Sequence, residues 1–142
     1  MTGTRAPSRW SVVVDGDPVP QGSKNAVAAG RVVEVSAARL KPWRDAIAWR
    51  ATQARNAAGV WRPASGPVEL GVVFRLRCGR GGVPGAAATV TPDVDKLLRA
   101  VLDALSGVAY ADDRQVADVR AVKRWAAAGE RPGVEIAVGF GV

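Results

Sequence analysis

The sequence predicts an α+β fold in which two main helices pack on a mixed, mostly antiparallel sheet of about four strands. Apolar residues recur with the two-residue period of strands in several segments, and two segments between them carry apolar residues at helical spacing. The predicted order is β-α-β-α-β-β, which is typical of helices packed on one sheet. With 142 residues, the chain is expected to form a single domain over residues 1–142.

Four segments have the composition of strands, because they are rich in β-branched residues and are bounded by glycine and proline. The predicted strands cover residues 10–15, 68–78, 115–125 and 133–142. In the last strand, every second residue from Val134 to Phe140 is apolar, so we expect these side chains to point one way. A short hairpin is a further expectation, because Val27 and residues 32–35 flank Gly30.

Two segments have the spacing of amphipathic helices. The first covers residues 36–59, with Pro42 expected in its first turn, where its missing N–H group does no harm. Trp43 is predicted to lie in the core, whereas Trp49 falls on another face of this helix and is a candidate interface residue. The second helix is expected to stop at Gly107. Its apolar stripe consists of Leu97, Leu98, Val101, Leu102 and Leu105.

The chain contains no histidine and one cysteine, which excludes most catalytic templates. Without histidine there is no Ser-His-Asp or Cys-His nucleophile and no imidazole metal ligand. Cys78 cannot form an intramolecular disulfide, and its apolar surroundings in the sequence predict a buried residue. Any chemistry must therefore rest on carboxylates, lysine, arginine and a metal ion.

The net charge of +7 makes a polyanion the leading candidate partner, because lysine and arginine neutralise phosphates. Basic surfaces also serve solubility or anionic membranes, but no basic amphipathic helix dominates one end of the chain. No run of about 18 apolar residues is present, and the first ten residues lack the apolar core of a signal peptide. We therefore expect a cytoplasmic protein without a membrane partner.

An acidic motif is the strongest chemical signal in the sequence. Asp93 and Asp95 stand two residues apart before the second helix, and in an extended segment this spacing sends both carboxylates to one side. Mg²⁺ prefers hard oxygen ligands, so the pair can hold half of a magnesium site, which Asp113 or Asp112 could complete. The alternative is structural: the first pair could cap the helix, and the second pair could form a turn.

The segment from Pro92 to Val116, PDVDKLLRAVLDALSGVAYADDRQV, resembles the signature of RusA-type Holliday junction resolvases. That signature joins a D-x-D helix start to an L-D-A-L helix end, then an aromatic residue and D-D-x-Q-V, and a strand that carries a lysine, here Lys123. Residues 18–24 and the helix around Trp43 also resemble many relatives. The resemblance implies a Mg²⁺-dependent endonuclease, in which Mn²⁺ can substitute, that resolves Holliday junctions by paired nicking in DNA recombination and repair.

The resemblance also implies the roles of the acidic residues. Asp93, Asp95 and Asp113 match the catalytic, metal-binding carboxylates of the family, and Asp112 is a second-tier candidate. Asp103 matches a family position as well, but its spacing of four residues from Arg99 predicts a salt bridge within the helix.

The basic residues of the motif depart from the family pattern. Many relatives have a catalytic lysine where this chain has Arg99, and asparagine where it has Lys96. Arg99 can stabilise charge on a phosphate but cannot give up a proton, so Lys96 is the alternative basic group. The candidates for contact with the DNA backbone are Lys24, Arg31, Arg77, Arg80, Lys96, Arg99, Arg114, Lys123 and Arg124.

A four-way junction presents two symmetry-related scissile phosphates, so we expect a homodimer that binds branched DNA. The glycine-rich residues 79–85 lack the phosphate-binding pattern of a P-loop, which argues against a nucleotide cofactor. The resemblance suggests a bacterial host and a phage or prophage origin. Two other functions remain open: a nucleic-acid-binding module that does not cleave, and a metal-dependent nuclease for other branched or duplex DNA.

Overall fold

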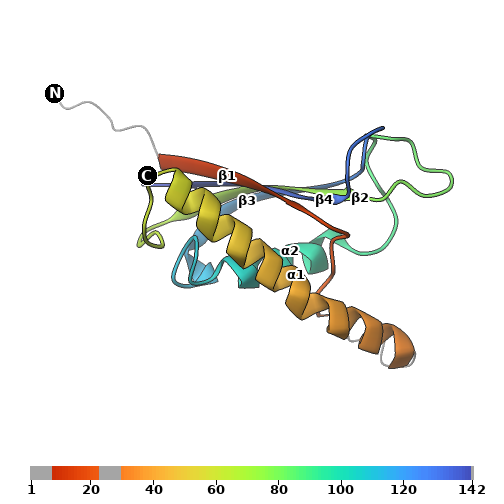
Figure 1. Cartoon of the computed structure of the whole chain (residues 1–142), viewed down its shortest axis with the longest axis horizontal. Helices are drawn as coiled ribbons and strands as arrows, with labels where there is room; N and C mark the ends of the chain where they lie inside the picture. The colour runs from red at the N-terminus through yellow and green to blue at the C-terminus, as the bar shows by residue number, and fades with distance from the viewer. Residues whose placement is uncertain (1–7, 23–29, 142) are drawn as a thin grey trace.

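The computed structural model describes residues 8–22 and 30–141 of the chain. The predicted α+β class and the element order are confirmed, and Figure 1 shows both helices on one side of the sheet. The elements are β1 (Ser8–Asp15), α1 (Gly30–Ala57), β2 (Val68–Leu76), α2 (Val94–Leu105), the short 3₁₀ helix η2 (Asp113–Gln115), β3 (Val116–Trp125) and β4 (Gly133–Phe140).

The four strands form one mixed sheet in the order β1-β4-β2-β3. β4 runs antiparallel to both of its neighbours, whereas β2 and β3 are parallel. The parallel pair requires a crossover connection, and α2 lies within it. Because this crossover returns the chain to the sheet edge, α2 and η2 are placed beside β3, and α1 packs against α2 and β1.

The core lies between the sheet and the two helices. β2 alternates strictly over most of its length, and Val72 and Phe74 are almost completely buried. In β4 the side chains of Val134, Ile136 and Val138 are buried, which confirms the predicted direction of the last strand. The predicted stripe of α2 is confirmed in part, because Leu97, Val101 and Leu105 are buried but Leu98 and Leu102 are only half-buried.

The first helix differs from its prediction. It begins at Gly30, so residues 32–35 are helical and the predicted hairpin is wrong there, while Val27 lies outside the described residues. Pro42 is inside α1 and not in its first turn. Residues 32–35 are rich in valine, but the preference of β-branched residues for strands over helices is weak. A growing helix gains one hydrogen bond per added residue, and this gain can override the preference.

Other predictions for single residues have mixed outcomes. Trp43 is 6% exposed and lies in the core as predicted, and Trp49 is 65% exposed on α1. β2 ends at Leu76, earlier than predicted, so Cys78 falls in the following loop and is half-buried rather than buried. Among the described helices, none is long and apolar enough to cross a membrane.

Candidate active site

The acidic pair lies at the start of α2, but not in the extended segment that we predicted. Asp93 occupies the N-cap position and Asp95 lies in the first turn of the helix. The Asp93 carboxylate makes no capping hydrogen bond, although its backbone carbonyl accepts from Leu97 at 3.1 Å. Both residues are exposed, and neither side chain has a hydrogen bond or ion pair with another described residue. A capping hydrogen bond therefore does not account for this pair, whereas both carboxylates do lie at the positive end of the helix dipole.

Lys123 holds the segment that leads into the acidic pair. It lies near the end of β3, and its ammonium group donates to the backbone carbonyl of Pro92 at 2.9 Å and to that of Val90. Because Pro92 directly precedes Asp93, these bonds fix the entry of the chain into α2. In this structure the lysine that we expected at the DNA backbone thus binds the protein backbone beside the acidic motif.

Arg99 lies one helical turn beyond Asp95 and is exposed. The segment around Gly22 packs directly beside it, since a Cβ atom on Gly22 would come within 2.5 Å of the Arg99 guanidinium. The backbone N–H of Gln21 donates to the Lys96 carbonyl at 3.0 Å, which fastens this segment to α2. The predicted DNA contact Lys24 lies outside the described residues, as does the side chain of Arg31.

Asp103 does not form the predicted salt bridge with Arg99. Its carboxylate accepts from the side-chain amide of Gln21 and lies 3.9 Å from the Arg44 guanidinium. Arg44 also donates to the Gln21 side-chain oxygen at 3.0 Å. These three side chains join α1, α2 and the segment before residue 23. The packing of α1 against α2 brings Arg44 to the Asp103 carboxylate, where Arg99 was expected to bind. The Arg99 side chain is exposed.

Gln115 organises the turn that carries the second acidic pair. Its side-chain oxygen accepts from the N–H groups of Ala111 and Asp112, at 2.9 and 3.0 Å. Its side-chain nitrogen donates to the carbonyls of Ala64 and Gly66, at 2.8 and 3.0 Å. The glutamine of the D-D-x-Q-V motif therefore has a structural role, because it fixes η2 against the loop before β2.

The two acidic residues of this turn have different environments. The Asp112 carboxylate accepts a hydrogen bond from the backbone N–H of Arg114 at 2.9 Å, which holds the pKa of Asp112 below its usual value. Asp112 is thus the N-cap of η2. Asp113 is exposed, its backbone carbonyl accepts from the N–H of Val116, and its carboxylate forms no ion pair with another described residue. The structure therefore separates a capping aspartate from one that is available to a ligand.

Tyr110 locates Asp113 relative to α2. Its ring is fully buried, and its hydroxyl donates to the Leu102 carbonyl at 2.7 Å. Burial raises the pKa of Tyr110, and the negative charges of Asp113 and Asp103 raise it further. Because the Tyr110 hydroxyl bonds Leu102 and η2 contacts α2, the turn that carries Asp113 lies beside the C-terminal half of α2.

The site residues thus form a line along α2 and not a cluster. Asp95, Arg99 and Asp103 repeat every four residues on one helix face, and a rise of about 1.5 Å per residue separates the first from the last by about 12 Å along the axis. Across residues 8–22 and 30–141, no group of three or more acidic or cysteine side chains is close enough to hold a metal ion.

The candidate DNA contacts fall into two kinds. Arg80, Arg99 and Arg114 are exposed, and Lys96 is half-buried at the start of α2. Two other candidates, Arg77 and Arg124, are paired with carboxylates of the chain. Arg77 lies 3.5 Å from Asp17 while remaining exposed, and Arg124 donates to Glu130 at 2.6 and 2.9 Å, which raises the pKa of Arg124.

Comparison with known proteins identifies one family. The model of the family described as Endodeoxyribonuclease RusA matches residues 15–139. The match runs from the end of β1 into β4 and contains every described residue of the α2 line and of η2. A search of the curated proteins found no match to the chain.

Proposed function

The chain belongs to the RusA endodeoxyribonuclease family, and we propose that it is a Mg²⁺-dependent enzyme that resolves Holliday junctions by paired nicking. Membership of the family makes the chain a DNA endonuclease. The observation that carries the finer proposal is the pair Asp93 and Asp95, two exposed carboxylates at the start of α2 without a hydrogen bond or ion pair to a described residue.

This pair has the donor chemistry that Mg²⁺ requires. Magnesium is usually held by one or two carboxylates, and water and substrate phosphate oxygens complete its coordination. Asp93 and Asp95 would hold the ion, and Asp113 is the third acidic candidate. When bound, the ion lowers the pKa of a water molecule and neutralises phosphate oxygens. Mn²⁺, which also prefers oxygen ligands, is expected to substitute.

Arg99 and the other basic residues around the acidic pair would position the substrate. Arg99 presents a planar guanidinium that can donate two hydrogen bonds to a phosphate, one turn from Asp95. It stays charged at all relevant pH values, so its role is to stabilise negative charge and not to transfer a proton. Lys96, Arg80 and Arg114 extend the positive charge on either side, which offsets the repulsion between the carboxylates and DNA.

A synthetic four-way junction tests the proposal directly. We expect nicking in Mg²⁺ or Mn²⁺ and none in EDTA, with paired nicks across the junction. Junction binding without nicking under any divalent metal would identify a binding module that has lost cleavage. Equal cutting of the junction and of linear duplex at one fixed salt concentration would instead identify a nuclease of broader substrate range.

Paired nicking requires two active sites that are related by symmetry, so the proposal includes a homodimer. Separate replacement of Asp93, Asp95 and Asp113 by asparagine ranks their contributions. We expect loss of cleavage with retained junction affinity for each carboxylate that holds the ion. An asparagine variant with full activity would remove that residue from the site.

A further inference from the structure

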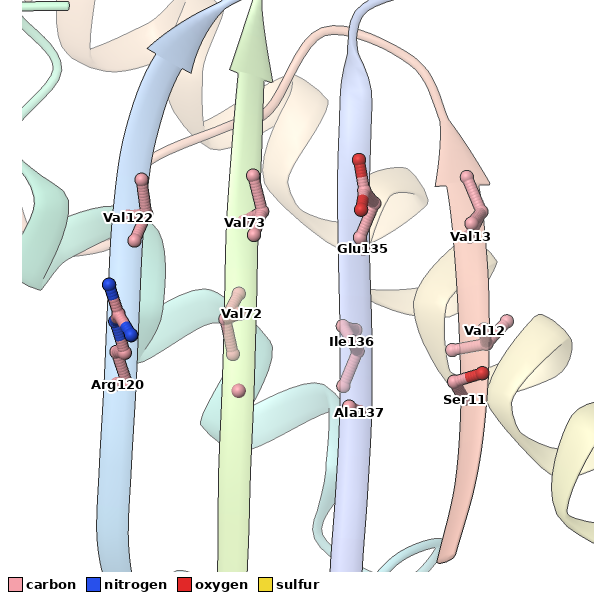
Figure 2. A pocket seen from close by; sticks show the side chains of 11 residues that line it. Ser11, Val12, Val13, Val72, Val73, Arg120, Val122, Glu135, Ile136 and Ala137 are labelled. Carbon is pink, nitrogen blue, oxygen red and sulfur yellow. The ribbon is translucent and has the colours of Figure 1, made fainter. Parts of the chain in front are cut away.

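The face of the sheet opposite α1 and α2 is open to solvent at its centre. Figure 2 shows this face, with the helices behind the sheet and side chains from all four strands in front. Ser11, Arg120 and Ala137 are exposed, and the Val13 side chain is 51% exposed although it is apolar. These residues line one shallow hollow together with Val73, Val122 and their strand neighbours.

The strand register arranges the side chains of this face in four parallel rows that cross the sheet from β1 through β4 and β2 to β3. The first row is Arg9, Gly139, Glu69 and Asp118. The second row is Ser11, Ala137, Gly71 and Arg120. The third row is Val13, Glu135, Val73 and Val122. The fourth row is Asp15, Gly133, Arg75 and Arg124.

These rows are self-complementary in shape. The second row has small side chains on β1, β4 and β2, so it forms a groove beside the larger side chains of the third row. A two-fold axis that runs parallel to the rows, between the second and the third, would place the third row of one chain over the second row of another. The ridge of each sheet would then fill the groove of its partner.

The rows are self-complementary in charge as well. The same axis would place the first row over the fourth row of the other copy. Arg9 would then face an aspartate, Glu69 an arginine, and Asp118 an arginine, while glycine would face glycine on β4. All three charged positions of the first row would therefore meet the opposite charge, which is the pattern that fixes the register of an interface. Within one chain, Arg9 already pairs with Glu69, and Arg75 and Arg124 pair with Glu130 and Glu135. The contacts between the copies would therefore extend these ion-pair networks and would not neutralise free charges.

The charge balance of the open face also argues against DNA as its occupant. The four rows carry four arginines and four acidic residues, and the Glu130 carboxylate lies against Arg75 and Arg124, so this surface has no excess positive charge in a chain whose net charge is +7. The excess positive charge therefore lies elsewhere on the molecule. A polyanion would gain little from this surface, whereas a protein surface with mixed charges fits it.

We propose that a second copy of this chain docks on the open face, so that two sheets pack against each other in the homodimer. This inference rests on the proposed function, because that function requires a dimer. The strands of the two sheets would be nearly aligned, with the sheets about 10 Å apart, as in other sheet-on-sheet packings. Since α2 lies beside β3, both α2 helices would border the same end of the two-fold axis, where a symmetric junction could reach both.

The size of the face is close to that of a specific interface. Four strands about 4.8 Å apart and about eight residues long cover roughly 500 Å² in projection. Side chains make the accessible area larger than its projection. The face therefore approaches the roughly 800 Å² per partner that is typical of specific interfaces.

Sedimentation of the full chain tests this interface. Val73→Asp places a charge in the centre of the face, and we expect the dimer dissociation constant to rise at least 100-fold. Asp118→Arg would bring two positive groups together and should raise it about 10-fold at low salt and less at high salt. Asp45→Arg makes the same change in net charge on the exposed side of α1, outside the open face, and should leave the dimer intact.

Val13→Asp, on the edge strand β1, replaces the central variant if that variant does not fold, as judged by circular dichroism. A dimer that survives the folded valine variants would overturn the proposed interface, as would a monomer caused by Asp45→Arg or by Trp49→Ala on α1. A wild-type monomer that nicks junctions would overturn the dimer and leave the nuclease in place. Dimers that do not nick would support the interface and remove the enzyme activity.

Discussion

Lys123 and Arg124 are neighbours in β3, but their side chains lie on opposite faces of the sheet and bind different partners: backbone carbonyls for Lys123 and carboxylates for Arg124. On the open face, Arg124 and the buried Arg75 are surrounded by carboxylates, including Glu130 at 2.6 Å from Arg124 and 3.2 Å from Arg75. On the helix face, Lys123 holds backbone carbonyls beside Asp93, whose own carboxylate makes no capping hydrogen bond.

The comparison shows how to distinguish structural from functional charges in this fold. Charges that stabilise the fold are matched by partners within the described part of the chain. The acidic pair at α2 lacks such partners, although its backbone is fixed by Lys123. A rigid backbone that carries carboxylates without internal partners is the arrangement expected for a metal or substrate site, because the ligands are positioned before binding.

Asp95→Asn is expected to give the largest effect. The carboxylate is a proposed ligand, so junction nicking should fall by at least about 100-fold, comparable with the loss of one key electrostatic group in other enzymes. Junction affinity should stay equal or rise, because a repulsive charge is lost. The free energy of unfolding should change by less than about 0.5 kcal/mol. Single-turnover nicking and urea unfolding measure both quantities, and Asp45→Asn is the matched control.

Lys123→Met should give the next largest effect. If Lys123 positions the acidic pair, its loss should weaken Mg²⁺ binding by about 10- to 100-fold, as is typical for groups that orient metal ligands. The midpoint of activity against Mg²⁺ concentration should shift, and high Mg²⁺ should restore part of the rate. A lysine that contacted DNA would instead lower junction affinity and reduce its salt dependence while the Mg²⁺ midpoint stayed constant.

Arg75→Met tests the paired group on the open face. Removal of this buried guanidinium would leave Glu130 and Glu135 with fewer partners and should lower the free energy of unfolding by about 1 to 3 kcal/mol. Those carboxylates remain partly exposed, so the cost should be below that of a fully buried pair. Nicking per folded dimer should be unchanged at concentrations that saturate dimerisation. A variant as stable as the wild type would show that the pairing adds nothing to stability.

The smallest effect concerns pH. The hydrogen bonds from Arg124 lower the pKa of Glu130 from 4.5 to about 2. A depressed pKa in the folded state contributes stability that is present above pH 4.5 and is lost as the pH falls towards 2. Glu130→Gln should therefore lower the melting temperature at pH 7, and the difference from the wild type should shrink between pH 4.5 and 2. A difference that is constant over this range would contradict the assignment.

Much of the fold could be predicted because the signals are local. The alternation in β4 and the apolar stripe of α2 follow from residues that are near each other in the sequence. α2 ends at Leu105, and Gly107 follows the C-cap residue Ser106 with a positive φ of 87°. The predicted start of α1 is wrong, because a β-branched run has only a weak preference for a strand over a helix. The sequence also could not show which of Asp112 and Asp113 caps η2, since this depends on which carboxylate accepts the hydrogen bond from the N–H of Arg114.

The sequence by itself determined the class of fold, the family resemblance and the acidic residues that are candidates for the chemistry, because residue types and short spacings encode these properties. The tertiary structure decided which charges have partners. It placed Lys123 on the carbonyls before Asp93, and it placed the turn that carries Asp113 beside the C-terminal half of α2. The physical reason is distance along the chain: about 30 residues lie between Lys123 and the carbonyls that it binds, and only the packing of β3 beside α2 brings them together.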